Sequence, residues 1–192
     1  MFVKTEEAQE KLRSDWAAQV TDRRYLAVVE NVPDPLQGTI HNWLKKNAAF
    51  RVYELNRPEP EAEEAITDYK VVNVVGRRAL VELELGTGRS NQIRVHMAGI
   101  GCPVVGDTKY GLPGAKGRLA LHACRLAFTH PKTGELVKFE SGLPVELKKQ
   151  LSRPTQPKDQ ESRDRPRGAQ GAKAVRPEGG REPKGVPRSR LR

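Results

Sequence analysis

The sequence predicts an α+β domain with a mostly antiparallel mixed sheet, flanking helices and a basic C-terminal tail. Segments with the two-residue period of β-strands outnumber those with a helical period. Short turns that contain glycine or proline join most neighbouring strands, which favours antiparallel pairing. Residues 1–150 also contain enough apolar residues to form a core, so we expect one domain there.

Residues 151–192 differ from the rest of the chain in composition. They contribute 12 Lys/Arg and 5 Asp/Glu, which accounts for +7 of the formal net charge of +10, and they contain no aromatic residue. Six prolines and five glycines lie in the same stretch. Such a segment cannot bury enough apolar surface to offset its chain entropy. We therefore predict a disordered basic tail over residues 151–192.

The domain is predicted to begin with a helix from Thr5 to about Val20. Two glutamates follow Thr5 in the first turn, where acidic side chains are favourable. Apolar residues then recur every four positions, at Ala8, Leu12 and Trp16. A strand follows over residues 24–30, in which Tyr25 alternates with Leu26.

Two further strands are predicted to form a hairpin in the middle of the chain. Before them, residues 33–35 make a turn, residues 38–46 form a short segment, and residues 51–64 have the proline and acid content of a loop. The hairpin joins an apolar strand over residues 69–75 to a strand over residues 78–85. The second strand is typical of a half-buried strand, because one face carries Ala79, Val81, Leu83 and Leu85.

A short helix is predicted after this hairpin. Gly86 and Gly88 allow a tight turn, and Ser90 is placed to cap a free amide of the helix. Gly101 is expected to end the helix in the left-handed conformation. The apolar face of the helix is formed by Ile93, Met97 and Ile100.

Arg89 and Arg94 flank the start of this helix. The N-terminus of a helix is electropositive because its first amides have no partner within the helix. Two guanidinium groups that converge there favour an anion, either a phosphate or a carboxylate. Ordinary surface ion pairs are the alternative, and the local pattern does not decide between the two.

The C-terminal part of the domain is predicted to add a hairpin and a helix. Residues 106–116 are rich in glycine and form a loop, in which Asp107 is interpreted as a loop-forming residue. A turn at residues 131–134 joins strands over residues 119–128 and 136–140. Pro144 begins a helix that extends through Leu151, because proline is tolerated at the first helical position.

Four blocks of the sequence carry its most specific motifs. Two of them are Thr-Gly-Arg-Ser-Asn-Gln-Ile-Arg-Val-His at residues 87–96 and Gly-Cys-Pro-Val-Val-Gly-Asp-Thr-Lys-Tyr-Gly at residues 101–111. The others are Arg-Arg-Tyr-Leu-Ala-Val-Val at residues 23–29 and, after residue 117, Arg-Leu-Ala-Leu-His-Ala with Thr-His-Pro-Lys-Thr-Gly-Glu. In their order along the chain, the four blocks resemble RluA-type pseudouridine synthases, and the resemblance covers about residues 2–147.

The resemblance implies a fold, a reaction and part of a site. The family's fold is a long antiparallel sheet with flanking helices, and its reaction isomerises uridine to pseudouridine in RNA, here ribosomal or transfer RNA, without a cofactor. The uracil leaves its ribose at N1, rotates in the pocket and rejoins through C5. Tyr25 matches the family's active-site tyrosine, and the arginine at the position of Arg94 pairs with a nucleophilic aspartate.

The chemistry of nearby side chains suggests how RNA binds. We expect Arg89, Asn91 and Gln92 to contact phosphate and sugar. Arg24 and the tail would add a salt-sensitive attraction that does not depend on sequence. The resemblance implies RNA as the partner, and we expect a monomer. We also expect a cytoplasmic protein, because the sequence contains no apolar run of 18 residues that could span a membrane.

Metal and disulfide chemistry are not expected. The spacings of His96, His122 and His130 resemble no zinc pattern, so His96 and His122 are interpreted as structural. Cys102 and Cys124 lie in unrelated contexts, which favours free or buried thiols.

The family's nucleophile is absent from the matching region. In the family an Arg-Leu-Asp block precedes these motifs, and no Arg-Leu-Asp occurs in this sequence. We expect either a truncated synthase domain, whose Met1 is internal to a longer reading frame or begins a shortened chain, or a non-catalytic RNA-binding protein derived from the fold. Both hypotheses predict no turnover by this chain alone. A basic architectural protein is disfavoured, because it leaves the motifs unexplained.

Overall fold

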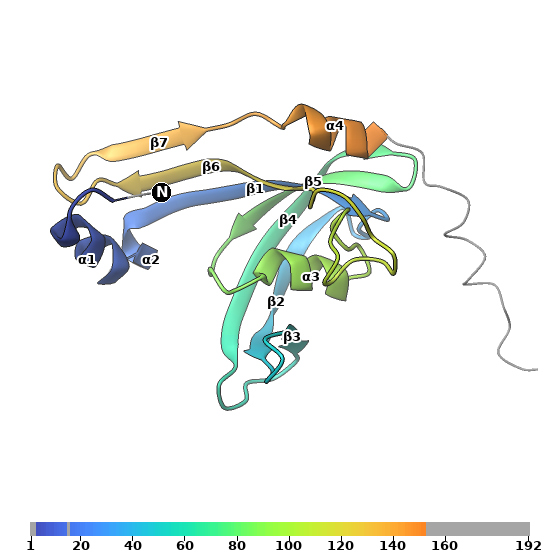
Figure 1. Ribbon diagram of the computed structural model, residues 1–192, viewed down its shortest axis with the longest axis horizontal. Coiled ribbons are helices and arrows are strands. Elements are labelled where there is room, and N and C mark those ends of the chain that lie inside the picture. Colours follow the sequence, from blue (N-terminus) through green and yellow to red (C-terminus); the bar gives the residue numbers. More distant parts are fainter. Residues whose placement is uncertain (1–2, 15, 153–192) are drawn as a thin grey trace, which may run out of the picture. The chain divides into compact units, whose positions relative to one another are not determined.

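The computed structural model describes residues 3–14 and 16–152 of the chain (Figure 1). The chain divides into two compact units, residues 1–155 and residues 156–192, and the described residues all belong to the first. The predicted disorder of the basic tail therefore concerns residues outside the described part. Only Leu151 and Ser152 of that tail are described, and they complete a helix.

An antiparallel sheet forms the body of the described residues (Figure 1). Its seven strands lie in the order β3-β2-β4-β5-β1-β6-β7, and each neighbouring pair is antiparallel. The predicted α+β class with a mostly antiparallel sheet is thus confirmed. The strands are β1 (Val20–Glu30), β2 (Gln37–Lys46), β3 (Val52–Leu55), β4 (Glu63–Val75), β5 (Arg78–Leu85), β6 (Leu121–Thr129) and β7 (Leu136–Glu140).

Four helices accompany the sheet within the described residues. They are α1 (Glu6–Ser14), α2 (Trp16–Gln19), α3 (Gln92–Gly99) and α4 (Val145–Ser152). The helix predicted after Pro144 is confirmed as α4. The two predicted hairpins are confirmed as β4–β5 and β6–β7.

The N-terminal helix is shorter than predicted. α1 ends at Ser14, where the Ser14 hydroxyl and the Gln19 side-chain amide both donate to the carbonyl of Lys11. Val20 belongs to β1, because it pairs with Phe128 on β6. The prediction of one helix through Val20 is therefore wrong at its end, since pairing with the sheet outweighs the helical period there.

The segment predicted as a loop over residues 51–64 contains a strand. β3 pairs with β2, so that Lys46 lies opposite Val52 and Trp43 lies opposite Leu55. Val52 is buried together with Leu44 of β2, and this packing favours the strand. The two prolines, Pro58 and Pro60, lie in the connection that follows, whereas Glu54 belongs to β3 and Glu63 and Glu64 begin β4.

α3 matches its predicted pattern except at its end. Ile93 and Met97 are buried, as expected, whereas Ile100 follows the helix and is exposed. Gly101 adopts the predicted left-handed conformation with φ 76°, and its amide donates to the carbonyl of Ala98.

The register of the sheet decides which side chains lie on the same side as α3. His96 of α3 bonds to Oγ1 of Thr67 on β4, and Thr67 lies opposite Leu85 on β5. Leu83, two positions before Leu85, lies opposite Tyr25 on β1. Directly opposed residues of an antiparallel pair point to the same face. Tyr25 therefore lies on the α3 face of the sheet.

α4 covers the other face of the central strands. The guanidinium of Arg78, which alternates with the buried Ala79 on β5, donates to the carbonyl of Gln150 in α4. Leu147 of α4 is fully buried. Neighbouring residues of β1 such as Val28 and Val29 are both fully buried, so the core occupies both sides of these strands.

Shortening the side chain of Leu147 tests the packing of α4. The Leu147→Ala variant should lower the free energy of unfolding by about 2–5 kcal/mol, because it leaves a cavity in the core. Val145→Ala is the matched control on the same helix, and its exposed position predicts a change below about 0.5 kcal/mol. Urea unfolding followed by circular dichroism measures both, and equal effects would contradict the packing of α4.

Candidate functional site

The turn between β5 and α3 carries most of the residues predicted to bind RNA. Ser90 does not cap the helix as expected. Asn91 occupies the N-cap position in the left-handed conformation, with φ 57° and ψ 16°, which asparagine tolerates better than most residues. Oε1 of Gln92 organises the turn instead, because it accepts bonds from the amide of Arg89 at 2.8 Å and from the hydroxyl of Thr87 at 2.9 Å.

Gln92 also begins a buried chain of hydrogen bonds. It is 2% exposed, which corrects the expectation that its side chain contacts RNA. Its Nε2 donates to Oγ1 of Thr67, and Nδ1 of His96 lies 2.9 Å from the same hydroxyl. Nε2 of His96 lies 2.9 Å from Oδ1 of Asn42, whose Nδ2 donates to Glu54 at 3.0 Å. The chain connects α3 to β4, β2 and β3.

This chain of bonds fixes the protonation of His96. Oδ1 of Asn42 can only accept, so Nε2 of His96 carries the proton between them. Burial lowers the pKa of His96 to about 4, which leaves the imidazole neutral near neutral pH and Nδ1 without a proton. The hydroxyl of Thr67 therefore donates to Nδ1. The role predicted for His96, a structural one, agrees with this arrangement.

The stability of the protein should fall as the pH is lowered from 6.5 toward about 4. The unfolded His96 binds a proton in this range and the folded His96 does not, so protonation favours unfolding. Below the folded pKa both states are protonated, and the loss from this residue is complete at about 3 kcal/mol. The measurement is the free energy of urea unfolding between about pH 7 and pH 5.

The His96→Gln variant is the control for this titration. Glutamine has no proton to gain in this range, so its free energy of unfolding should decrease less with falling pH. Identical slopes for the two proteins would contradict a buried, neutral His96.

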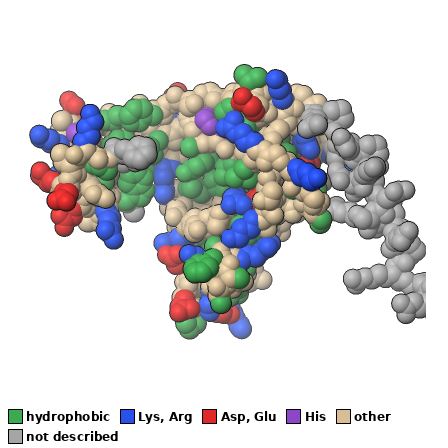
Figure 2. Space-filling view, in the orientation of Figure 1, with side chains coloured by type: hydrophobic (Ala, Val, Ile, Leu, Met, Phe, Trp, Pro, Cys, Tyr) green, Lys and Arg blue, Asp and Glu red, His purple; other side chains and the backbone are tan. Residues whose placement is uncertain are grey.

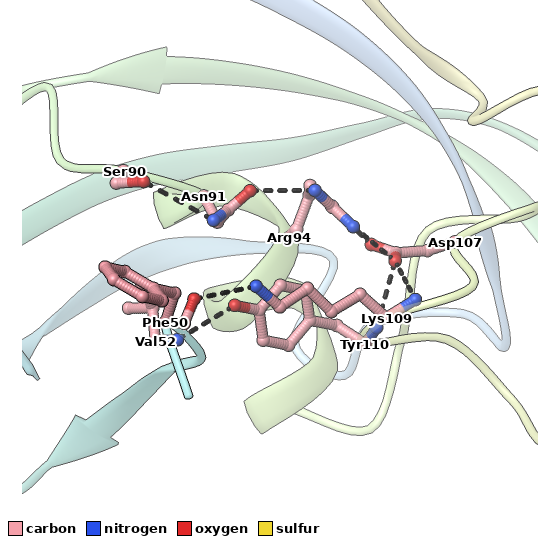
Figure 3. A network of polar contacts seen from close by, with 8 residues as sticks. All are labelled: Phe50, Val52, Ser90, Asn91, Arg94, Asp107, Lys109 and Tyr110. Atoms are coloured by element: carbon pink, nitrogen blue, oxygen red, sulfur yellow. Dashed lines mark hydrogen bonds and ion pairs between the residues drawn. The ribbon is translucent and has the colours of Figure 1, made fainter. Parts of the chain in front are cut away.

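Arg94 of α3, which is partly buried, forms an ion pair with the buried carboxylate of Asp107 (Figure 3). Nε of Arg94 lies 2.7 Å from Oδ2, and Nη2 lies 2.7 Å from Oδ1, of Asp107, whose side chain is 0% exposed. Oδ1 also accepts bonds from the amides of Lys109 and Tyr110, each at 2.9 Å. Burial alone would raise the pKa of Asp107, but these bonds and the charge of Arg94 hold its pKa below the ordinary value. Asp107 is ionised and organises its loop, as the sequence indicated.

Arg89 has a different partner from Arg94. Nη1 of Arg89 lies 2.7 Å from Oε1 of Glu63, and its Nε donates to a backbone carbonyl of β4. Nη1 of Arg94 donates to Oδ1 of Asn91 at 2.7 Å. The expectation that both guanidinium groups converge on one anion is thus corrected, because each pairs with its own carboxylate. The resemblance implied that Arg94 pairs with a nucleophilic aspartate. Within the described residues, the carboxylate that pairs with Arg94 is that of the loop-forming Asp107.

A cleft of about 310 Å³ opens on the α3 face of the sheet. Tyr25 and Arg89, two of the predicted site residues, line it together. None of the described residues that line it is acidic, and three are arginines. Two of these arginines already have carboxylate partners, since Arg89 pairs with Glu63 and Arg125 pairs with Asp22 and Glu140. The cleft thus places guanidinium groups beside the aromatic ring of Tyr25. The lining residues are Trp16, Arg23, Tyr25, Leu85, Gly88, Arg89, Ala123, Arg125 and Leu126. Arg94 does not belong to this set.

Arg24 points to the opposite face from Tyr25, because successive side chains of a strand alternate. Its guanidinium pairs with three carboxylates there, those of Asp22, Glu82 and Glu84. Arg23 lies beside Tyr25 instead and donates from Nη2 to the carbonyl of Leu85. Sequence reasoning did not assign Arg23 to the site, although its spacing of two residues from Tyr25 indicates the shared face.

The remaining candidate ligands serve local structure. Nε2 of His122 lies 3.3 Å from the carbonyl of Ser141, and Nδ1 of His130 accepts bonds from two amides of its own turn. Cys102 and Cys124 are free thiols, as expected. Among residues 3–14 and 16–152, no group of three His, Cys, Asp or Glu side chains could hold a metal ion. No helix in the same part of the chain is long and apolar enough to cross a membrane.

Comparisons with known proteins agree on one family. The sequence profile of RNA pseudouridylate synthases matches residues 1–99. The uncharacterized RNA pseudouridine synthase YhcT of Bacillus subtilis is 36% identical over 77% of this chain and 49% of its own length. The dual-specificity RNA pseudouridine synthase RluA of Escherichia coli O157:H7 is 33% identical over 71% of this chain and 64% of its own length.

A solved structure shares the fold. The human RNA pseudouridylate synthase domain containing 1 superposes with a TM-score of 0.59 and 25% identity, over 70% of this chain and 59% of that one. The chain spans about half the length of most of the curated relatives that it matches. Together with the four sequence blocks, these matches show that the chain belongs to the RNA pseudouridylate synthase family, in its RluA type.

Proposed function

We propose that the chain forms the uridine-binding side of an enzyme that isomerises uridine to pseudouridine in ribosomal or transfer RNA. Family membership supports the reaction. One relative, from Zymomonas mobilis, is named a ribosomal large subunit pseudouridine synthase, and it is 32% identical to this chain. The observation that carries the proposal is the cleft in which Tyr25 and Arg89 lie together, on the face of the sheet occupied by α3.

The residues of the cleft have the chemistry that this reaction needs. The target uridine must leave its stack in order to be reached, so it needs an aromatic surface and a cationic rim. The ring of Tyr25 can stack on the uracil, and its hydroxyl can take part in proton transfer at C5. Arg23 and Arg89 are placed to bind the phosphates on either side of the flipped nucleotide.

The nucleophile must come from residues other than those that line the described cleft. The described lining residues include no carboxylate, and the sequence contains no Arg-Leu-Asp block. Asp107 is not a substitute, because its carboxylate is buried and already accepts bonds from Arg94 and two amides. We therefore propose that this chain alone binds RNA without converting uridine. The absence of a carboxylate among the described cleft residues also favours the alternative, a non-catalytic RNA-binding protein derived from the same fold.

The first test measures conversion. The 192-residue chain, incubated with a stem–loop RNA whose loop uridine carries tritium at C5, should release no tritium. The RluA protein of Escherichia coli, acting on an RNA that it converts, serves as the positive control. Tritium release by this chain would contradict the absence of a nucleophile.

The second test measures binding of the same RNA by fluorescence anisotropy. Tyr25→Ala should weaken binding by roughly 5-fold or more, because base stacking on an aromatic ring contributes about 1–3 kcal/mol. Arg89→Ala should weaken it and also reduce its dependence on salt. Arg118→Ala is the matched control, since Arg118 is exposed and pairs with Glu146 of α4 outside the cleft. Affinities that do not differ among the three variants would contradict the cleft assignment.

A further inference from the structure

A second surface with the chemistry of an RNA contact lies outside the Tyr25 cleft. Figure 2 shows Lys and Arg side chains gathered over α3 and the neighbouring β2–β3 turn. The turn between β2 and β3 and the loop after Asp107 meet here. We call this surface the basic platform, and it consists of Lys46, Phe50, Arg51, Lys109 and Tyr110. It shares no residue with the cleft.

Cations surround the aromatic rings of the basic platform. Arg51 and Lys109 lie 5.1 Å and 5.5 Å from the centre of the Tyr110 ring, and Lys46 lies 5.8 Å from that of Phe50. Among the described residues, none of these three cations has a carboxylate within ion-pair distance. Lys45, by contrast, lies 3.6 Å from Glu59. The platform therefore carries positive charge that the described residues do not neutralise.

The sequence around the platform explains this surplus charge. Residues 36–53 and residues 108–134 contain no aspartate or glutamate. The platform draws Lys46, Phe50 and Arg51 from the first segment and Lys109 and Tyr110 from the second. A surface with uncompensated charge of one sign attracts a partner of the opposite sign, here a polyanion.

Phe50 is held in an exposed position at the tip of the turn (Figure 3). Its side chain is 73% exposed, and its backbone adopts the left-handed conformation with φ 55°, which a bulky residue rarely adopts. Nζ of Lys109 donates to the carbonyl of Phe50 at 2.8 Å, and the amide of Val52 donates to the hydroxyl of Tyr110 at 3.0 Å. The loop after Asp107 thus fixes the turn and leaves the Phe50 ring free to stack.

We propose that the basic platform binds RNA beside the nucleotide that enters the Tyr25 cleft, so the inference rests on the proposed function. Lys46, Arg51 and Lys109 contact phosphates, and Phe50 stacks on an unpaired base next to the helical stem. The exposed ring of Phe50 among cations that have no carboxylate partner in the described part of the chain fits this partner, because nucleic acid offers both phosphates and flat bases. An acidic protein surface would satisfy the cations but not the ring of Phe50.

The test compares two RNAs on the full 192-residue chain. One is a stem–loop with a uridine in its loop, and the other is the loop sequence alone as a single strand. Arg51→Gln and Phe50→Ser should each weaken binding of the stem–loop by roughly 3–10-fold. The single strand should lose less affinity, because it lacks the stem that would hold the flanking base and its phosphates over the platform. Arg51→Gln should also reduce the slope of log affinity against log salt by about one, the value for one lost phosphate contact.

Matched controls separate the platform from general surface effects. Arg118→Gln removes one charge from an exposed ion pair, and Phe139→Ser removes an exposed ring from β7. Both should bind the stem–loop as the unmodified chain does. Arg51→Lys keeps the charge and should recover most of the affinity.

Each outcome bears on the platform or on the proposed function. If Arg51→Gln and Phe50→Ser bind both RNAs normally while Arg89→Ala weakens binding, the platform is overturned and the cleft stands. If Arg89→Ala also has no effect, the proposed function fails as well. If poly-L-glutamate competes as well as the stem–loop for the binding that depends on Arg51, the partner is an acidic protein and the platform is overturned.

Discussion

Asp107 accepts four hydrogen bonds in a fully buried position, and the surface around α3 depends on them. Two come from Arg94, and two come from the amides of Lys109 and Tyr110. These two residues then hold the β2–β3 turn, through the carbonyl of Phe50 and the amide of Val52. A buried carboxylate without these donors would be too costly to keep ionised. The ion pair thus connects α3, its following loop and the turn.

The sheet determines which side chains line the Tyr25 cleft. Its register and the two-residue period put Tyr25 and Arg23 on the α3 face and Arg24 on the opposite face. The neutral His96 at the centre of a hydrogen-bonded chain attaches α3 to that face without a buried charge. The cleft and the basic platform are separate surfaces that both depend on α3. Arg89, which lines the cleft, lies just before α3, and Arg94 of α3 holds Asp107, which in turn binds the amides of Lys109 and Tyr110.

Local patterns predicted most of the fold. The strand over residues 78–85, the hairpin turn at Gly76 and the left-handed Gly101 each depend on neighbouring residues alone, and the structure has all three. The strand β3 depends on the burial of Val52 against distant residues, so its sequence gave no signal. The family resemblance identified Tyr25, and the place of Arg89 at the start of the predicted helix identified that arginine; the two share a cleft. They could not reveal that Gln92 is buried or that Arg94 pairs with Asp107, because both depend on tertiary contacts.

A double-mutant cycle on Arg94 and Asp107 tests most directly whether their ion pair supports this surface. Arg94→Gln, Asp107→Asn and the double variant are unfolded with urea under the same conditions. Each single change should lower the free energy of unfolding by about 3–5 kcal/mol, because it leaves a charge without its partner, and the double change should cost much less than their sum. Costs that add to within about 0.5 kcal/mol would show that the two residues act independently and would contradict the central role of the pair.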